Sequence, residues 1–207
     1  MSLSKVNMFI LNGSGRAGKD SFVEFCTDAM DFKGYVYSIS TVDFIKDIAK
    51  EAGWNGQKDE ASRKYLSDLK DIFTNWLDTP YKKVEKKMSM LNLMIEQYNL
   101  SIPVFLFVHC REPKEIERLK KDFGAKTILL KRDSIEQIKS NHADAEVYNY
   151  DYDYFIENNG SLNNLEEKAK IFMNAFLTQK NCPYCGHHID HNFYCPICNK
   201  DIADLKF

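Results

Sequence analysis

The feature that most constrains this chain is a glycine-rich loop at residues 13–18. The loop follows a short apolar run at residues 6–11 and has the spacing Gly-x-x-x-x-Gly-Lys, which ends at Lys19. Behind it, apolar residues recur at helical spacing across residues 22–30. A buried strand, a glycine loop, a lysine and a helix in this order are the context that a phosphate-binding loop (P-loop) requires.

The residue types of this loop suit a bound phosphate. Gly13 and Gly18 let the backbone turn its N–H groups inward, because glycine has no Cβ to obstruct them. The helix that begins near Lys19 adds unpaired N–H donors and the positive end of its dipole, and the lysine supplies a movable positive charge. A glycine turn that only joins strand to helix is the plainer alternative, but it leaves the position of Lys19 unexplained.

One position departs from the usual P-loop pattern. Asp20 stands where a P-loop normally carries a Ser or Thr that binds Mg²⁺, and the hydroxyl comes one residue later, as Ser21. One residue on a helix is a rotation of about 100°, so Ser21 cannot simply replace the usual ligand. Asp20 could hold Mg²⁺ directly or through water, or it could be an acid that the helix dipole stabilises. The sequence leaves both interpretations open.

Length and charge narrow the class of the protein. The 207 residues suit one ordinary domain with a small appendage. A formal net charge of −2 argues against a protein that coats nucleic acid or an anionic membrane, and no apolar stretch approaches the roughly 20 residues of a membrane span. The apolar run before the loop is too short for a signal peptide, so we expect a cytoplasmic protein whose cysteines are reduced unless they bind metal.

Strands and helices alternate along residues 1–178, which predicts an α/β kinase domain built as a three-layer parallel sheet. Further strands are expected at 35–38, 103–108, 126–130 and 154–157. Further helices are expected at 60–77, 81–98 and 112–123, from Ser40 or Thr41 to Ala52, and from a cap at Ser161 to residue 177. The composition changes abruptly at Asn181, so residues 179–207 are expected to form a separate module.

The residues that follow the predicted strands favour one class of P-loop protein. GTPases and motor-type ATPases need an aspartate after a strand such as 103–108, which here leads into His-Cys-Arg-Glu. A small-molecule kinase instead needs arginines around the transferring phosphoryl group and a lid that expels water. Arg111 and Arg132 directly follow predicted strands, Arg63 lies in the insertion after the second strand, and the polar segment 132–150 could form the lid. Each arginine alone could also be an ordinary surface charge.

Four further segments accompany the Gly-Lys-Asp loop. They are Ser-Thr-Val-Asp-Phe-Ile-Lys at 40–46, Gly-Trp at 53–54 followed by Arg63, Arg-Glu-Pro-Lys-Glu-Ile at 111–116, and Tyr-Phe-Ile-Glu-Asn-Asn-Gly-Ser-Leu at 154–162. Together they resemble the phage-type deoxynucleoside monophosphate kinases, which are similar in outline to the animal phosphomevalonate kinases. The resemblance implies a nucleoside-monophosphate-kinase-like fold, ATP as donor, Mg²⁺ as cofactor, and a small-molecule nucleotide substrate as acceptor.

The resemblance also implies roles for individual residues. The donor phosphates would be held by the loop and the first helical turn, namely Gly13, Ser14, Gly15, Arg16, Ala17, Gly18, Lys19, Asp20 and Ser21. The acceptor would be faced by Ser40, Asp43, Lys46 and Arg63, and the adenine would lie near Asn158 and Gly160. Arg111 would bridge the two sets of phosphates and Arg132 would close from the lid, so the expected catalytic residues are Lys19, Arg111 and Arg132.

Two parts of this assignment have open alternatives. Related sequences often carry Asp two residues before the strand-end arginine, where this chain has His109. A neutral imidazole accepts a hydrogen bond but brings no negative charge, which puts an acid that orients Arg111 or a Mg²⁺-bound water in doubt. Ser40 and Asp43 could equally be the cap and the first-turn acid of a solvated helix.

The tail carries two Cys-Pro-x-Cys knuckles, formed by Cys182 and Cys185 and by Cys195 and Cys198. Four thiolates fill the tetrahedral shell of Zn²⁺, and in a cytoplasmic protein this spacing indicates zinc rather than disulfides. We therefore expect a zinc ribbon whose metal is structural and supplies much of the stability of the module. Its lysines and aspartates cancel in charge, so we expect it to dock on protein rather than on nucleic acid.

The sequence as a whole predicts an ATP-dependent nucleoside monophosphate kinase with a zinc-ribbon tail. A P-loop kinase for another small phosphorylated or hydroxylated acceptor is a second hypothesis. A nucleotide-binding switch or scaffold, whose zinc module contacts a partner, is the third. Oligomeric state has no signature in the sequence.

Overall fold

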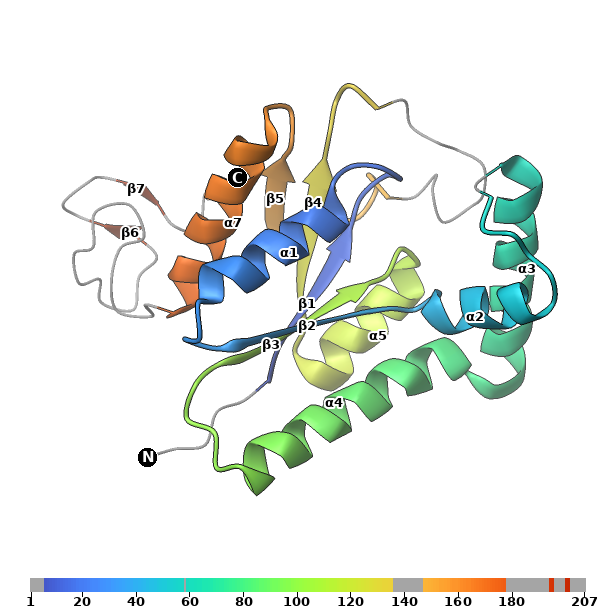
Figure 1. Cartoon of the computed structure of the whole chain (residues 1–207), viewed down its shortest axis with the longest axis horizontal. Coiled ribbons are helices and arrows are strands. Elements are labelled where there is room, and N and C mark those ends of the chain that lie inside the picture. Colours follow the sequence, from blue (N-terminus) through green and yellow to red (C-terminus); the bar gives the residue numbers. More distant parts are fainter. Residues whose placement is uncertain (1–5, 58, 136–146, 178–193, 196–199, 202–207) are drawn as a thin grey trace.

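The computed structural model describes residues 6–57, 59–135 and 147–177, together with the short segments 194–195 and 200–201. Its centre is a sheet of five strands in the order β2-β3-β1-β4-β5, which Figure 1 shows between two sets of helices. The strands are β1 (Val6–Asn12), β2 (Tyr35–Ser40), β3 (Val104–His109), β4 (Lys126–Lys131) and β5 (Tyr154–Glu157). All neighbouring pairs are parallel, so the predicted α/β class is confirmed.

Helices cover both faces of the sheet, as parallel strands require. On one face α1 (Lys19–Met30) packs beside α7 (Leu162–Leu177), and on the other lie α4 (Thr79–Gln97) and α5 (Pro113–Phe123). Beyond the end of β2 the chain forms α2 (Asp43–Glu51) and α3 (Glu60–Leu77). The described domain therefore has the predicted three layers, with α2 and α3 as an insertion beside the sheet.

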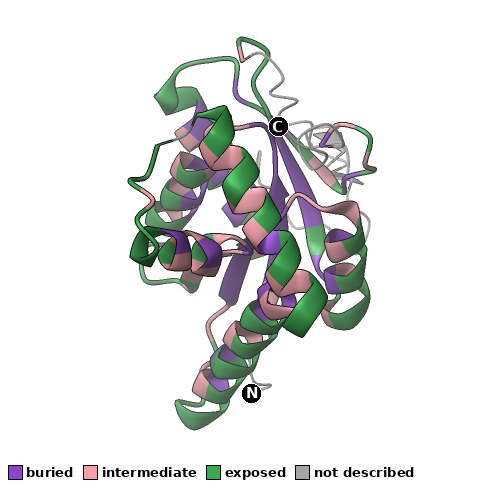
Figure 2. Cartoon of the chain, turned by 90° about the vertical axis from the view of Figure 1, so that its right-hand side faces the viewer, coloured by how far each residue is buried: buried purple, intermediate pink, exposed green. Residues whose placement is uncertain are grey.

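Side chains of the central strand alternate between two apolar clusters. Phe9 and Leu11 belong to the cluster beneath α1 and α7, whereas Met8 and Ile10 belong to the cluster beneath α4 and α5. Figure 2 shows the result, with buried strands and helices whose outer surfaces are exposed. Because both faces are covered, the consecutive apolar residues Met8–Leu11 are all buried, which is why a mostly apolar run was enough to predict β1.

The position of β1 in the middle of the sheet places the glycine loop. The chain leaves β1 toward β2 on one side, and it leaves β3 and β4 toward the opposite side. In open α/β sheets, ligands bind outside the carboxyl ends of the strands at the point where connections diverge in this way. The loop after β1, His109 at the end of β3 and Lys131 at the end of β4 share this edge.

Two helix beginnings show where local sequence signals were sufficient and where they were not. At α7, Ser161 is the expected cap: its Oγ accepts from the N–H of Asn164 at 3.3 Å, and its own N–H donates to Asn164 Oδ1 at 3.0 Å. At α2, the expected cap at Ser40 or Thr41 is wrong. Ser40 still pairs with β3 as the last residue of β2, and the helix begins at Asp43.

The C-terminal tail is described only at β6 (Tyr194–Cys195) and β7 (Lys200–Asp201), which pair antiparallel. The expected domain boundary at 178, the ligands Cys182, Cys185 and Cys198, and the side chain of Cys195 lie outside the described residues. Among the side chains that are described, no group of three His, Cys, Asp or Glu could hold a metal ion. The zinc ribbon stays a prediction.

No described helix has the length and apolarity to cross a membrane.

Candidate functional site

The glycine loop closely abuts the neighbouring strands. Gly13 has a φ of 143°, and a Cβ there would lie 2.2 Å from the carbonyl oxygen of Leu130 in β4. Gly18 has a φ of 99°, and its Cβ would lie 2.5 Å from Asn158 Nδ2. Both the backbone conformation and the space therefore require glycine at these two positions. At the exposed tip of the loop, Arg16 adopts the left-handed region with a φ of 67°, which is strained for a residue with a side chain.

Lys19 places its charge at the loop itself. Its Nζ donates to the carbonyl oxygens of Gly13 at 2.7 Å and Ser14 at 2.9 Å. Gly18 occupies the N-cap of α1 and offers no side chain to cap the helix. A phosphate is a group that fits such a helix end, because it accepts from backbone N–H groups and matches the dipole. The loop thus has the geometry that its spacing predicts.

Asn158 supports this loop from the far side of β4. Its side chain is buried, and Nδ2 donates to the carbonyl oxygen of Ala17 at 2.9 Å. Its backbone N–H donates to the carbonyl oxygen of Lys131 at 2.7 Å, which continues the pairing of β4 with β5. Gly160 follows at the exposed turn before α7, close to Asn164. Asn158 therefore holds the glycine loop in place through Ala17. Its contact with adenine stays a prediction.

Three residues that the sequence analysis did not single out complete the support of the loop. Asn12 is fully buried, with Oδ1 accepting from the N–H of Gly13 at 2.7 Å and Nδ2 donating to the Tyr152 hydroxyl at 2.7 Å. Tyr148 joins its hydroxyl to Ser14 Oγ at 2.9 Å. An amide that ends a buried strand directly before a glycine was a signal in the sequence. The two tyrosines gave none, because they lie more than 130 residues away.

His109 stands between the loop and α2. Its Nδ1 lies 3.9 Å from Oδ1 of Asp20, whose side chain is fully exposed on the first turn of α1. Burial lowers the pKa of His109 and outweighs the opposing effect of Asp20; Lys19 and Lys46 lower it further, whereas Asp43 raises it. The imidazole is therefore neutral at pH 7, and it brings no charge of its own to the site.

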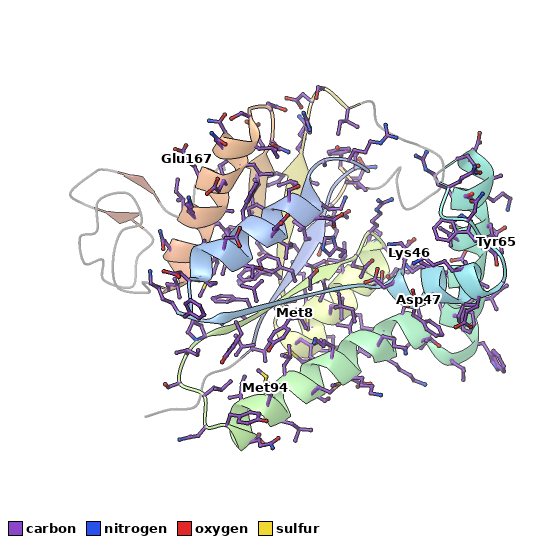
Figure 3. All side chains as sticks on the ribbon, in the orientation of Figure 1. Met8, Lys46, Asp47, Tyr65, Met94 and Glu167 are labelled. Carbon is purple, nitrogen blue, oxygen red and sulfur yellow. The ribbon has the colours of Figure 1, made fainter. Side chains whose placement is uncertain are left out.

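The expected acceptor residues of α2 lie near the loop but are exposed. Asp43 accepts from the N–H of Ser40 at 2.8 Å through Oδ2, and its Oδ1 lies 3.4 Å from Lys46 Nζ. Both Asp43 and Lys46 act electrostatically on His109, so the start of α2 lies close to the end of β3 that borders the loop. Ser40 does not cap α2, so only its acceptor role stays a prediction. For Asp43 both interpretations stay open, because a first-turn acid is also what an ordinary solvated helix start favours. Figure 3 shows Lys46 on α2 and Tyr65 farther out on α3.

The three arginines come from different elements. Arg111 follows β3 and precedes α5, and Arg132 is exposed directly after β4. Arg63 is half-buried in the first turn of α3, where its charge contributes to the lowered pKa of Asp59, behind the hydrogen bonds that Ser62 donates. Among the residues that the structure describes, no recorded contact joins Arg63 or Arg132 to the loop. Their convergence on phosphates stays a prediction.

A largely buried ion pair ties α3 to α5 behind these arginines. Lys70 Nζ lies 2.9 Å from Oε2 of Glu115, and the Cys110 thiol donates to the same oxygen at 3.2 Å. Burial, followed by the charge of Glu115, raises the pKa of the Cys110 thiol. Cys110 therefore stays protonated and acts as a small buried apolar residue next to Arg111. The ion pair therefore holds α3 of the insertion against α5.

Comparisons with known proteins give little beyond this geometry. No protein-family model matches the chain, and no curated protein matches it. Among solved structures, it is similar to an unliganded sugar kinase from Janibacter sp. HTCC2649, at 9% sequence identity and a TM-score of 0.40. The match covers 83% of this chain and 95% of that one. A similarity this low does not carry an argument about fold or function, so the proposal below rests on the chain itself.

Proposed function

We propose that this protein is an ATP-dependent kinase that transfers a phosphoryl group to a nucleoside or deoxynucleoside monophosphate. The observation that carries the proposal is the loop after β1. Gly13 and Gly18 have backbone conformations that favour glycine, α1 begins behind the loop without a side-chain cap, and the Lys19 ammonium is held by two loop carbonyls. This arrangement presents N–H donors and a positive charge to one small volume at the carboxyl edge of the sheet.

The reaction needs positioning rather than a covalent intermediate. An oxygen of the acceptor phosphate attacks the γ-phosphorus of ATP, the bond to the β–γ bridging oxygen breaks, and ADP leaves with that electron pair. The loop N–H groups and Lys19 hold the donor phosphates and offset charge on the leaving group. We assign Arg111, Arg132 and Arg63 to the charge of the two facing phosphates, with Ser40, Asp43 and Lys46 beside the acceptor.

Magnesium fits one residue of this chain well. Asp20 has a carboxylate that is fully exposed on the first turn of α1, next to Lys19, and carboxylate oxygens are ligands that Mg²⁺ prefers. The ion would supply neutralisation of phosphate charge. Ser21 is half-buried one position later and is the alternative ligand.

A kinase for a hydroxylated acceptor is the second candidate, and His109 favours it. A hydroxyl loses its proton when it is phosphorylated, whereas a monophosphate acceptor is already ionised. The neutral imidazole beside the loop could accept that proton. In that case the residues of α2 would face a sugar or a similar alcohol.

Release of ADP from ATP tests these alternatives. The protein is incubated with Mg²⁺-ATP and, one at a time, with ribonucleoside monophosphates, deoxyribonucleoside monophosphates and hydroxylated or phosphorylated small molecules. We expect release that depends on a monophosphate and that falls roughly a hundredfold or more in Lys19→Ala, since the outer phosphates lose their cation. Release only with other acceptors would establish the second candidate. No release with any acceptor, with nucleotide still bound, would favour a switch or scaffold.

The zinc ribbon is proposed on the spacing of Cys182, Cys185, Cys195 and Cys198 alone. Elemental analysis of the purified chain should give about one zinc per protein, and Cys182→Ser should lower that ratio, because it removes one of four thiolates. An unchanged ratio would refute the four-cysteine site.

A further inference from the structure

A segment rich in tyrosine lies against the phosphate loop. Residues 147–152, Val-Tyr-Asn-Tyr-Asp-Tyr, precede β5, and we call them the tyrosine segment. Its three tyrosines occupy alternate positions, and each hydroxyl has a defined partner on another element. Two of these partners belong to the loop or to the residue before it, and the third belongs to α5. The segment is therefore connected to the loop at one side and to the body of the domain at the other.

The contact of Tyr148 reaches into the loop. Its hydroxyl lies 2.9 Å from Oγ of Ser14, whose side chain is buried. The carbonyl oxygen of Ser14 accepts from Lys19 Nζ at 2.9 Å and from the N–H of Ala17 at 3.2 Å. One residue of the loop thus joins Tyr148 to the lysine that meets the phosphates.

The contact of Tyr152 fixes the beginning of the loop. Its hydroxyl accepts from Asn12 Nδ2 at 2.7 Å and donates to the carbonyl oxygen of Val147 at 2.7 Å. Burial raises the pKa of Tyr152, so the hydroxyl keeps the proton that it donates. Val147 and Tyr152 pack on Leu129 of β4. These bonds hold the tyrosine segment in one conformation beside the loop.

Tyr150 connects the segment to a different element. Its hydroxyl donates to Oε1 of Glu117 in α5, and its ring packs edge-on against that of Tyr152 with centroids 5.0 Å apart. Tyr150 makes no recorded contact with the loop among the described residues. It therefore offers a matched control for Tyr148: the same residue type, in the same segment, bonded to a surface carboxylate instead of the loop.

We propose that Tyr148 is a positioning residue of the donor site, and that its hydrogen bond to Ser14 preorganises the loop before nucleotide binds. The inference rests on the proposed nucleotide-binding function of the loop. A loop that holds its binding conformation only part of the time binds with an affinity reduced by that fraction. A single neutral hydrogen bond shifts such an equilibrium roughly threefold to tenfold.

The first experiment measures binding of Mg²⁺-ADP by calorimetry, together with thermal unfolding. Tyr148→Phe is expected to weaken binding roughly threefold to tenfold while the unfolding midpoint stays close to that of the wild type. Tyr150→Phe should leave the affinity unchanged. If the enzyme is active, Tyr148→Phe should raise KM for ATP and leave kcat unchanged. Unchanged ADP affinity, or the same loss in Tyr150→Phe, would overturn the proposal.

A double-mutant cycle identifies Ser14 as the partner. Ser14→Ala should weaken ADP binding, and adding Tyr148→Phe should weaken it no further, because the shared bond is already lost. If the two losses multiply instead, Tyr148 acts through some other contact and the proposal is wrong.

Amide hydrogen exchange of the ligand-free protein provides a test without nucleotide. Tyr148→Phe should speed exchange at residues 13–19 relative to the wild type, and Tyr150→Phe should not. Faster exchange in a protein that binds neither ATP nor ADP would place the failure in the proposed function, since the loop would still be held by Tyr148. Unchanged exchange would overturn the positioning role directly.

Discussion

The candidate site has a donor side around the glycine loop and an acceptor side at the start of α2. The two sides differ in how far they are preorganised before a ligand binds. The donor side is tied by short hydrogen bonds: Asn12 Oδ1 accepts from the Gly13 N–H, Lys19 donates to the Gly13 carbonyl, and Asn158 donates to the Ala17 carbonyl. The side chains of Asn12 and Asn158 are buried. On the acceptor side, Asp43 and Lys46 make one exposed ion pair of 3.4 Å. A preformed loop binds without a large ordering cost. An open acceptor side can close on the correct partner and expel water only when that partner is present.

The difference also concerns where stability resides. Contacts around the loop join β1, β4, β5 and α7, the same elements that form the apolar core under α1. The polar residues at the starts of α2 and α3 lie near solvent and bond mainly to their own neighbours. We therefore expect substitutions at the buried donor-side positions Gly13 and Asn158 to change both folding and binding, and those on the acceptor side to change binding alone.

The largest effect is expected for Gly13→Ala. The new Cβ would lie 2.2 Å from the Leu130 carbonyl oxygen, at a φ of 143°. We expect a loss of at least ~2 kcal/mol in the free energy of unfolding, measured in urea. Gly124→Ala is the control, because that glycine also has a positive φ, of 64°, but no atom within 4 Å of a Cβ. Equal losses in the two variants would show that the close approach to β4 is unimportant.

Asn158→Ala should have the next largest effect. It removes the donor to the Ala17 carbonyl oxygen and leaves that buried acceptor unpaired, which costs about 1–3 kcal/mol. Weaker ADP binding should accompany the loss. Asn159→Ala serves as the control, since Asn159 is exposed and bonds only to Asp133 in the described structure. A change in stability without a change in ADP affinity would show that Asn158 stabilises the fold but does not contribute to nucleotide binding.

His109 lies between the donor and acceptor sides, and its titration should make the free energy of unfolding depend on pH. Its pKa in the folded protein is below that of the unfolded chain, so folding favours the neutral form. This contribution is complete above the unfolded pKa of about 6.5 and is lost as the pH falls through the folded value. Urea unfolding at pH 7.5 and 5.5 should show a larger fall for the wild type than for His109→Asn. Equal falls would contradict the assignment of a depressed pKa.

The smallest effect on stability is expected for Asp43→Ala. The carboxylate is exposed and its ion pair with Lys46 is worth roughly 0–1 kcal/mol. If Asp43 faces the acceptor, KM for the acceptor should rise while KM for ATP stays the same. Steady-state kinetics with each substrate varied in turn provide the measurement. A change in KM for ATP alone would show that Asp43 acts on the donor side and does not face the acceptor.

Local patterns in the sequence were enough for the sheet and for the loop. The apolar run of β1, the spacing of Gly13 and Gly18, and the cap at Ser161 each depend on residues a few positions apart. The support of the loop depends on pairs such as Asn12 with Tyr152, which are 140 residues apart. No periodicity or spacing encodes such a pair, because it exists only once β4 has paired with β1 and β5 with β4.

The expected convergence of the arginines on phosphates stays a prediction, and local sequence patterns could not derive it for the same reason. Arg63, Arg111 and Arg132 were located correctly relative to their strands and helices. Their orientation depends on how the insertion and the segment after β4 settle against the sheet. The start of α2 was misplaced because Ser40 was assigned from its own capping tendency, while its pairing with His109 in β3 decides the outcome.

The central place of β1 has a consequence for how the chain folds. The first strand along the chain pairs with residues 104–109 and with residues 126–129, and it has no neighbour closer in sequence. During synthesis it must wait for nearly a hundred further residues to emerge before it can pair with β3, and contacts of such long range slow folding. The residues that support the loop, from Leu130 to Asn158, are synthesised later still, so nucleotide binding should appear only late in biosynthesis.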